Sequence, residues 1–197
     1  MCGRYRLSRR KQFIAEYFET DNEVDWEPRY NIAPSQPVGI IRQDPSRPER
    51  HFSPARWGLI PSWASDASIG FKTINARAET VATKPAFRDA FVSRRCLLPA
   101  DGFFEWMRSG KEKQPFHFGM RDDSLFAFAG LWDRWRDPAG TVIESCSRWV
   151  SAYANRSPAP KWVPPREADG GDLGSAEALM RGRRPALSAK ELGACNR

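Results

Sequence analysis

The second residue of the chain, Cys2, offers chemistry that no internal cysteine has. In the start Met1-Cys2-Gly3, small residues follow the initiator methionine, which favours its removal; removal leaves Cys2 with a free α-amine beside its thiol. This amine has a pKa of about 7.7–8.0 and is partly unprotonated at neutral pH. It can condense with an aldehyde, after which the thiol closes the ring of a thiazolidine, or it can activate the thiol for acyl transfer. An ordinary second residue without a chemical role is the alternative.

Three other polar residues lie in strand-like segments that could place them beside a reacting group. Asn75 and Arg77 are two residues apart and therefore share one face of a predicted strand, although a solvated polar face is the alternative. Glu105 lies on the face opposite its neighbours Phe104 and Trp106. A carboxyl among aromatic rings tends to have a raised pKa, which suits proton transfer, whereas a salt-bridged residue at a sheet edge is the alternative.

The elements that must position these residues are predicted to be mainly short strands bounded by Gly, Pro or Asp turns. Seven are expected, at Val38–Arg42, Lys72–Arg77, Arg95–Leu98, Phe103–Trp106, Pro115–Met120, Leu125–Leu131 and Thr141–Cys146. Ser8 is expected to cap one helix, and Pro85 to begin a second. Because helices do not alternate with strands, we predict an α+β fold, mainly antiparallel, with a partly open, barrel-like sheet.

Composition excludes several classes of protein. The chain has 197 residues, 41% of them apolar, and a mean hydropathy of −0.61. It shows neither an apolar run of about 20 residues nor a signal peptide, so we expect a cytoplasmic protein that does not contact membranes. The four cysteines lie far apart without a CxxC pair, and the chain has two histidines, so we expect no metal and no disulfide framework. No cofactor motif is visible.

Residues 148–197 differ in composition from the rest of the chain. The formal net charge is +7, of which residues 1–147 contribute +3 and residues 148–197 contribute +4. All 12 Phe precede Leu131, and the last Ile is Ile143. A segment rich in Pro, Gly, Ala and Arg buries little apolar surface. We therefore predict one domain over residues 1–147, incomplete at its C-terminus, and a divergent, disordered tail over residues 148–197.

Several ordered blocks give the chain a specific resemblance. The start MCGRY resembles the SOS-response-associated peptidase (SRAP) family, as do RYNIAPSQ, RWGLIPSWA, INARAET, RRCLLPADGFFEW and AFAGLWD, which follow in the same order. The resemblance implies covalent capture of abasic sites in single-stranded DNA through a thiazolidine at Cys2, in the DNA damage (SOS) response. It also implies self-removal of the residues before Cys2 as a peptidase activity and a lyase-like Schiff-base step. The implied partner is single-stranded DNA with abasic sites, bound by a monomer that is nucleoid-associated when on DNA.

The same resemblance assigns roles to residues of the site. Asn75 orients the Cys2 end, and Glu105 is the acid and base that opens the sugar ring and moves protons during imine formation. Arg4 and Arg77 contact phosphates, Arg77 with its forked donors. An ordinary surface charge is the alternative for Arg4.

The resemblance also implies apolar walls for a DNA channel. Pro34, Trp57 and Trp63 are the matching residues, and stacking of a base on an aromatic ring requires no particular base sequence. A place in the core is the alternative for the tryptophans.

The chain departs from the family pattern after Cys146. The family continues with an apolar strand and a His-Asp-Arg-Met-Pro motif whose histidine partners the glutamate, whereas here no histidine follows His117. A frameshift near Ser147 is our hypothesis, with a divergent tail as the alternative. Cys2, Asn75 and Glu105 are expected to trap an aldehyde slowly, because the aminothiol supplies most of the reactivity. Two other functions stay open: a non-covalent or degenerate single-stranded DNA binder, and an N-terminal-cysteine peptidase that acts on protein.

Overall fold

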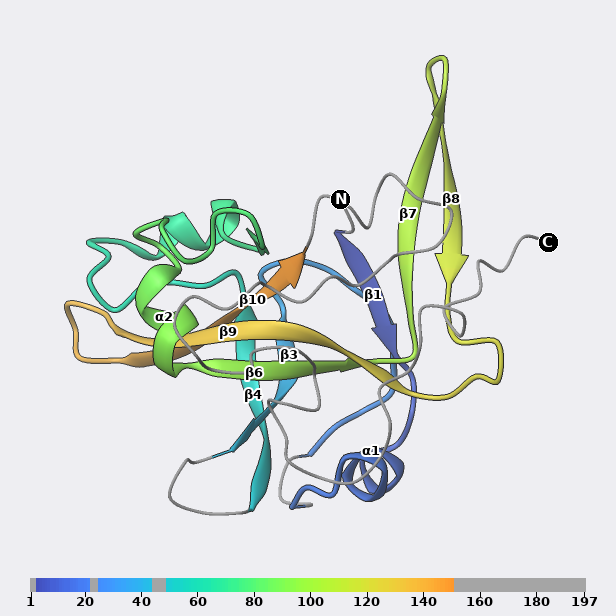
Figure 1. Cartoon of the computed structure of the whole chain (residues 1–197), viewed down its shortest axis with the longest axis horizontal. Helices are drawn as coiled ribbons and strands as arrows, with labels where there is room; N and C mark the ends of the chain where they lie inside the picture. The colour runs from blue at the N-terminus through green and yellow to red at the C-terminus, as the bar shows by residue number, and fades with distance from the viewer. Residues whose placement is uncertain (1–2, 22–24, 44–48, 151–197) are drawn as a thin grey trace.

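Two β-sheets make up most of the computed structural model, which describes residues 3–21, 25–43 and 49–150 (Figure 1). The smaller sheet has the order β2 (Arg29–Ile32), β1 (Arg4–Leu7), β7 (Gly102–Ser109) and β8 (Glu112–Phe118). The larger sheet has the order β4 (Arg50–Trp57), β3 (Pro37–Gln43), β6 (Arg95–Ala100), β9 (Phe126–Arg136), β10 (Val142–Val150) and β5 (Asn75–Arg77). A further pairing between β4 and β10 closes five strands of the larger sheet into a barrel.

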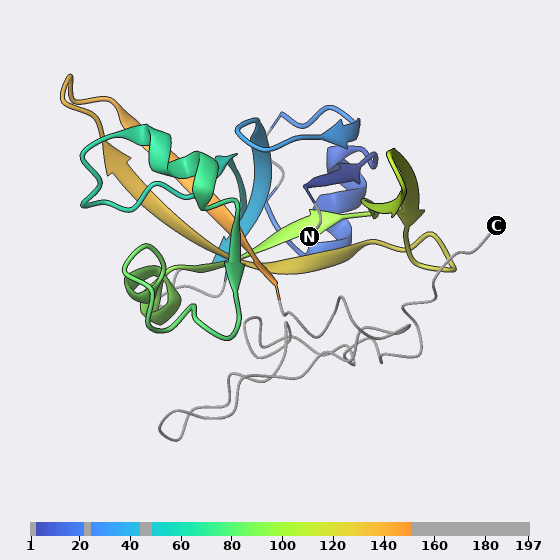
Figure 2. The same ribbon diagram turned by 90° about the horizontal axis from the view of Figure 1, so that it is seen from above.

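Three short helical segments complete the described chain: α1 (Lys11–Phe18), the 3-10 helix η1 (Ala67–Lys72) and α2 (Arg88–Ser93). In Figure 2, η1 and α2 lie at one end of the molecule and α1 lies at the other. The predicted α+β class, mainly antiparallel with a barrel-like sheet and few helices, is confirmed. The two parallel pairings, of β10 with β4 and with β5, are both short. None of the helices described is long and apolar enough to span a membrane.

Several predicted element bounds are wrong. The strands β1, β2 and β4 are absent from the prediction: β1 and β2 have four residues each, too few for a clear pattern, and polar residues interrupt the apolar alternation in β4. Lys72 ends η1, so the strand that carries Asn75 begins at Asn75 itself. The strand β10 continues to Val150, beyond the predicted end at Cys146. Ser147 and Arg148 are polar and yet buried in this strand, so hydrophobicity gave no signal for them.

Both helices also begin later than predicted. The N-cap of α1 is Arg10, whose side chain makes no capping hydrogen bond, whereas the hydroxyl of Ser8 donates to Asp101 Oδ2 (2.5 Å). The helix α2 begins at Arg88 rather than at Pro85, because hydrogen-bonded turns precede it.

A single residue, Asp101, joins β6 to β7 and marks the point where the chain passes from one sheet to the other. Its carboxylate is buried. Oδ1 lies 3.0 Å from Arg6 Nε, and Oδ2 accepts hydrogen bonds from the amide (2.9 Å) and the hydroxyl of Ser8. Asp101 therefore binds Arg6 of β1 and the following Ser8, and so holds the end of β1 at the point where the chain passes between the two sheets.

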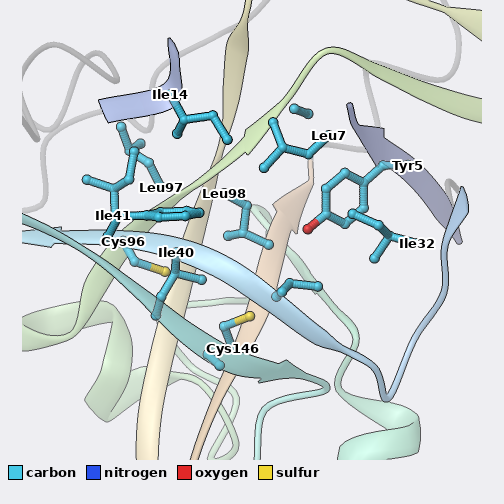
Figure 3. Packing of buried hydrophobic residues seen from close by; sticks show 14 of the residues in the cluster. Tyr5, Leu7, Ile14, Ile32, Ile40, Ile41, Cys96, Leu97, Leu98 and Cys146 are labelled. Atoms are coloured by element: carbon cyan, nitrogen blue, oxygen red, sulfur yellow. The ribbon is translucent and has the colours of Figure 1, made fainter. Parts of the chain in front are cut away.

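The core lies between the two sheets and inside the barrel (Figure 3). Tyr5 and Leu7 of β1 pack there with Ile14 of α1 and with apolar side chains from the larger sheet. The thiols of Cys96 and Cys146 are free and lie in this core, where burial raises the pKa of both well above the usual value for a thiol. Such buried thiols are not nucleophilic at neutral pH.

Replacement of Asp101 by alanine is expected to lower the free energy of unfolding by about 3 kcal/mol, because Arg6 and Ser8 lose a buried carboxylate partner. Urea unfolding measures the change. Asp122→Ala is the matched control, since this exposed carboxylate bonds only to the neighbouring Ser124, and we expect a loss of less than about 0.5 kcal/mol. Equal losses in the two variants would contradict the anchoring role of Asp101.

Candidate functional site

The start of β1 and the middle of β7 lie at the same end of the smaller sheet. Arg4 pairs with Phe104 in antiparallel register, so the chain direction takes the positions before Arg4 toward Glu105. The guanidinium Nη1 of Arg4 donates to Asn31 Oδ1 on β2 (3.0 Å), at the surface. Cys2 itself lies outside the described residues. It is covalently bound to Gly3, so it cannot be more than about 7 Å from the Cα atom of Arg4.

Glu105 is half-buried and lies on the same face of β7 as Phe103, two residues before it. The ring of Phe103 stacks on Phe118 of β8, with centroids 5.2 Å apart, and meets Phe128 of β9 edge-on at 5.8 Å. Phe103, Phe118, Phe126 and Phe128 form what we call the aromatic cluster. By strand alternation Glu105 shares the face of β7 that carries Phe103. Its place among aromatic rings stays a prediction.

Asn75 and Arg77 lie on β5, at the edge of the larger sheet. Their Cα atoms pair with Arg148 and Val150 at the end of β10, in parallel register. Ala76 between them is fully buried, whereas Asn75 is half-buried and Arg77 is exposed. Strand alternation thus directs both polar side chains away from the core, as predicted. The exposed guanidinium of Arg77 is accessible to an anion such as a phosphate.

Trp57 lies in the core, so the prediction that its ring lines a DNA channel is wrong. The residue is 0% exposed, and its indole Nε1 donates to the carbonyl oxygen of Ile74 (2.8 Å). Its ring meets Tyr5 of β1 edge-on, with centroids 5.3 Å apart. Because Ile74 directly precedes Asn75, Trp57 connects the strand that follows Cys2 with the strand that carries Asn75.

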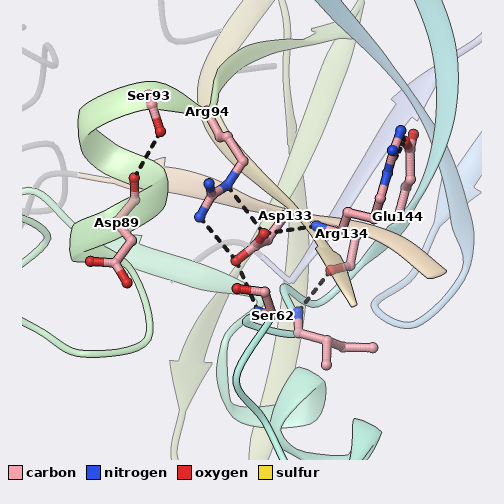
Figure 4. Close-up of polar contacts among 9 residues, drawn as sticks. Ser62, Asp89, Ser93, Arg94, Asp133, Arg134 and Glu144 are labelled. Carbon is pink, nitrogen blue, oxygen red and sulfur yellow. Dashed lines mark hydrogen bonds and ion pairs between the residues drawn. The ribbon is translucent and has the colours of Figure 1, made fainter. Parts of the chain in front are cut away.

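Trp63, by contrast, is 55% exposed and sits in a turn that β9 holds in place. Figure 4 shows Asp133, whose Oδ2 accepts a hydrogen bond from the amide of Ser62 (3.1 Å). The indole of Trp135 donates to the carbonyl oxygen of the residue that follows Trp63 (2.7 Å). Pro34 is half-buried in the turn between β2 and β3. The role of Trp63 and Pro34 as DNA contacts stays a prediction.

In the described ranges, no three His, Cys, Asp or Glu side chains come together in a way that could hold a metal ion. The two described cysteines, Cys96 and Cys146, are buried with raised pKa values. Neither is a candidate nucleophile. Cys2 and Cys195 lie outside the described residues, and the site is described around the end of the chain that carries Cys2.

Sequence analysis missed two residues near this site. Asn31 lies within the RYNIAPSQ block, but nothing in the pattern linked its side chain to Arg4. Arg148 lies in the segment assigned to the tail, yet it is 3% exposed and its Cζ lies 4.6 Å from the ring centroid of Phe128. Its pairing opposite Asn75 depends on sheet topology, for which the local sequence gives no signal.

Comparison with known families gives one match that covers most of the chain. The model of the family described as SOS response associated peptidase (SRAP) matches residues 1–157. This range includes all the predicted site residues and extends past the end of β10.

Curated relatives share the same region. The chain is 45% identical over 151 residues to the abasic site processing protein YoqW of Bacillus subtilis, a match that covers 75% of this chain and 66% of YoqW. It is 38% identical over 138 residues to the abasic site processing protein YedK of Escherichia coli, covering 66% of this chain and 59% of YedK. The chain thus spans about two thirds of the length of these relatives.

Solved structures show the same fold. A crystal structure of a protein from Bacteroides thetaiotaomicron aligns with a TM-score of 0.70 at 28% identity, over 76% of this chain and 68% of the other. A second, from Bordetella bronchiseptica, aligns with a TM-score of 0.68 at 29% identity, over 78% of this chain and 74% of the other.

Replacement of Trp57 by phenylalanine is expected to lower the free energy of unfolding by about 1–3 kcal/mol, because the carbonyl of Ile74 loses its indole donor and the core loses volume. Chemical denaturation measures the change. Trp63→Phe is the control, with an expected loss below about 0.5 kcal/mol because this ring is exposed. A stable Trp57→Phe protein would contradict the structural role of Trp57.

Proposed function

The chain belongs to the SOS response associated peptidase family, and we propose that it acts on abasic sites in DNA by trapping them covalently through Cys2. Its curated relatives are named abasic site processing proteins, which supports abasic DNA as the substrate. The single-stranded form of that DNA, the thiazolidine product and a place in the SOS response are part of this proposal.

The reaction uses the two nucleophiles of an N-terminal cysteine in turn. An abasic deoxyribose in its ring-opened form carries an aldehyde at C1′. The unprotonated α-amine of Cys2 adds to that carbon, and loss of water leaves an imine. The thiol then adds to the imine carbon: a C–S bond forms, the thiol proton ends on nitrogen, and a five-membered thiazolidine results. No oxidant, reductant or cofactor is required.

Glu105 and Asn75 are the side chains that we assign to this reaction. The register of β1 with β7 supports a role for Glu105, because the positions before Arg4 lead toward it. We assign it the proton transfers that open the sugar ring and release water. Asn75, on the strand tied to β1 through Trp57, orients the Cys2 end by hydrogen bonding.

Arg4 and Arg77 flank these residues and supply phosphate contacts. Both guanidinium groups lie at the surface, Arg4 with one nitrogen held by Asn31. Contacts of this kind position a strand of DNA without selecting its sequence, as a protein that binds lesions requires. The exposed indole of Trp63 and the turn at Pro34 offer apolar surface on which a flanking base can stack.

One observation carries the proposal: the buried ring of Trp57 connects β1 with the strand of Asn75, while Glu105 on the neighbouring β7 is half-buried and Arg77 is exposed. In the view of Figure 1 the start of β1 and the end of β10, beside which β5 lies, are both at the upper side of the molecule. The arrangement thus combines the half-buried carboxyl group of Glu105 with guanidinium groups of Arg4 and Arg77 that can bind phosphate.

Two other functions predict different behaviour. A non-covalent single-stranded DNA binder would use Arg4, Arg77 and Trp63 but form no bond to the lesion. An N-terminal-cysteine peptidase would cleave peptides without DNA, and self-removal of Met1 belongs to the same chemistry. The chain has no histidine after His117, so we propose that trapping relies on the aminothiol itself, with Glu105 and Asn75 in support.

Incubation with single-stranded DNA that carries one abasic site is expected to give a protein–DNA band that survives a denaturing gel. Cys2→Ala should abolish the band, because the imine can no longer close to a thiazolidine. Cys146→Ala is the control and should leave it, since that thiol is buried with a raised pKa. Binding that disappears at high salt without such a band would favour the non-covalent alternative. Peptide cleavage without DNA would favour the peptidase.

Replacement of Arg77 by alanine is expected to weaken binding to single-stranded DNA uniformly across sequences. It should also reduce the slope of log K against log salt concentration by about 0.7, the value for one phosphate contact. Fluorescence anisotropy at several salt concentrations measures both. Arg88→Ala is the matched control, because Arg88 is an exposed arginine on α2 that pairs with Asp89. Equal slopes for the two variants would show that Arg77 does not contact a DNA phosphate.

A further inference from the structure

One face of the smaller sheet points away from the core. Tyr5 and Leu7 of β1 are fully buried on the core side. Alternation turns Arg4 and Arg6 to the opposite side, which we call the outer face. The side chain of Arg6 is 27% exposed, and Arg4 Nη1 donates to Asn31 Oδ1 of β2 at the surface (3.0 Å). The outer face therefore presents two guanidinium groups from β1.

Contacts among β1, β7 and β8 show that aromatic rings share this outer face. A Cβ at Gly102 would collide with His117 Nε2 and lie 3.0 Å from Arg6 Nε, so both of these side chains cover β7 on the same side. The ring of His117 meets that of Phe104, with centroids 5.3 Å apart. Trp106, two residues further along β7, lies on the same face by alternation and is 40% exposed. The rings of Phe104 and Trp106 are thus neighbours of the arginines of β1.

The hairpin of β7 and β8 separates its charges between the two faces. Its register is continuous, and His117 pairs with Phe104. Alternation from this pair puts the exposed Lys113 on the outer face. Both carboxylates carried by the described strands of the smaller sheet, Glu105 and Glu112, fall on the other face. In Figure 1 this hairpin extends beyond the other described elements, so its outer face is open to a ligand.

Asp101 partners the cations of this region from below the surface. Its side chain is 1% exposed, with Oδ1 3.0 Å from Arg6 Nε and Oδ2 4.0 Å from Arg9 Nε. Two cations thus share one buried anion, and positive charge remains at the surface. A phosphate on the outer face would meet guanidinium groups rather than the carboxylate.

Single-stranded DNA combines the two kinds of group that fit this face. Its phosphates complement the cations, and its unpaired bases stack on aromatic rings whatever their sequence. In a duplex the flat faces of the bases are already stacked on one another, so an exposed ring such as that of Trp106 favours a single strand.

We propose that the outer face of the smaller sheet binds the single-stranded DNA that flanks the abasic site. A base stacks on Trp106, and neighbouring phosphates contact Arg6 and Lys113. The inference rests on the proposed function and extends it to a binding surface on β7 and β8. These strands follow β1 in the smaller sheet, so the flank of the lesion stays on the sheet to which Arg4 belongs.

The first test measures affinity for single-stranded DNA that carries a tetrahydrofuran in place of the abasic sugar and therefore has no aldehyde. Trp106→Ala should weaken binding about tenfold, because a stacked base loses its ring. Met107→Ala is the matched control, since Met107 is the next residue, is 55% exposed and lies on the other face of β7. It should change the affinity by less than about twofold. Trp106→Phe keeps a ring and should recover most of the loss.

The second test uses the unaltered protein, so it does not depend on how a variant folds. Burial, with Arg6 nearby, lowers the pKa of His117, and the carboxylates of Asp101 and Asp123 act in the opposite sense. Bound phosphates add negative charge, so an NMR titration should show the pKa of His117 about half a unit or more higher in the tetrahydrofuran-DNA complex. His51, on β4 of the larger sheet, is the internal control, and DNA should leave its titration curve unchanged.

Equal losses in Trp106→Ala and Met107→Ala, or an unmoved pKa of His117 in the complex, would overturn the inference. So would a dimer of the unaltered protein that Trp106→Ala separates without a change in DNA affinity, since the face would then join two copies of the chain. The proposed function has its own readout, the crosslink to DNA with a true abasic site. A crosslink with an unmoved His117 pKa keeps that function and refutes the outer face as the DNA surface. A raised His117 pKa without a crosslink does the reverse.

Discussion

The arrangement depends on how firmly a short strand at the start of the chain is held. Four residues of β1 cannot form a stable strand alone, and two separate contacts fix them. At one end, the buried carboxylate of Asp101 binds Arg6 and Ser8. Along the strand, Tyr5 packs against Trp57 inside the core. With both contacts present, Arg4 is held at a defined point in an inner strand of the smaller sheet.

The same core contacts also set the position of the larger sheet relative to β1. Trp57 donates to the carbonyl of Ile74, and the amide of Arg148 donates to the same oxygen. This shared acceptor fixes the residue before Asn75 relative to β1 and β10 together. A site assembled from both sheets therefore needs no lid to bring its parts together. The side chains that maintain the geometry are buried, and those available to a ligand, such as Arg77, are exposed.

Much of this architecture could be predicted from sequence, but the role of individual aromatics could not. Alternation correctly separated Asn75 from the buried Ala76. It could not tell a core tryptophan from an exposed one, because Trp57 and Trp63 lie in the same RWGLIPSWA block and their burial depends on tertiary contacts. The end of β10 was missed for a related reason, since its residues are polar and their burial comes from neighbouring strands.

The burial of β10 explains why composition is a poor guide to how far this strand extends. Ser145 and Ser147 are fully buried, and the hydroxyl of Ser145 accepts a hydrogen bond from the amide of Ile60 (2.8 Å). Such residues add little hydrophobic free energy, but their backbone groups complete the pairings with β9 and β5. Leaving these groups unpaired in the interior would cost more than burying the polar side chains. The last described residues of the strand bring Arg148 beside Asn75.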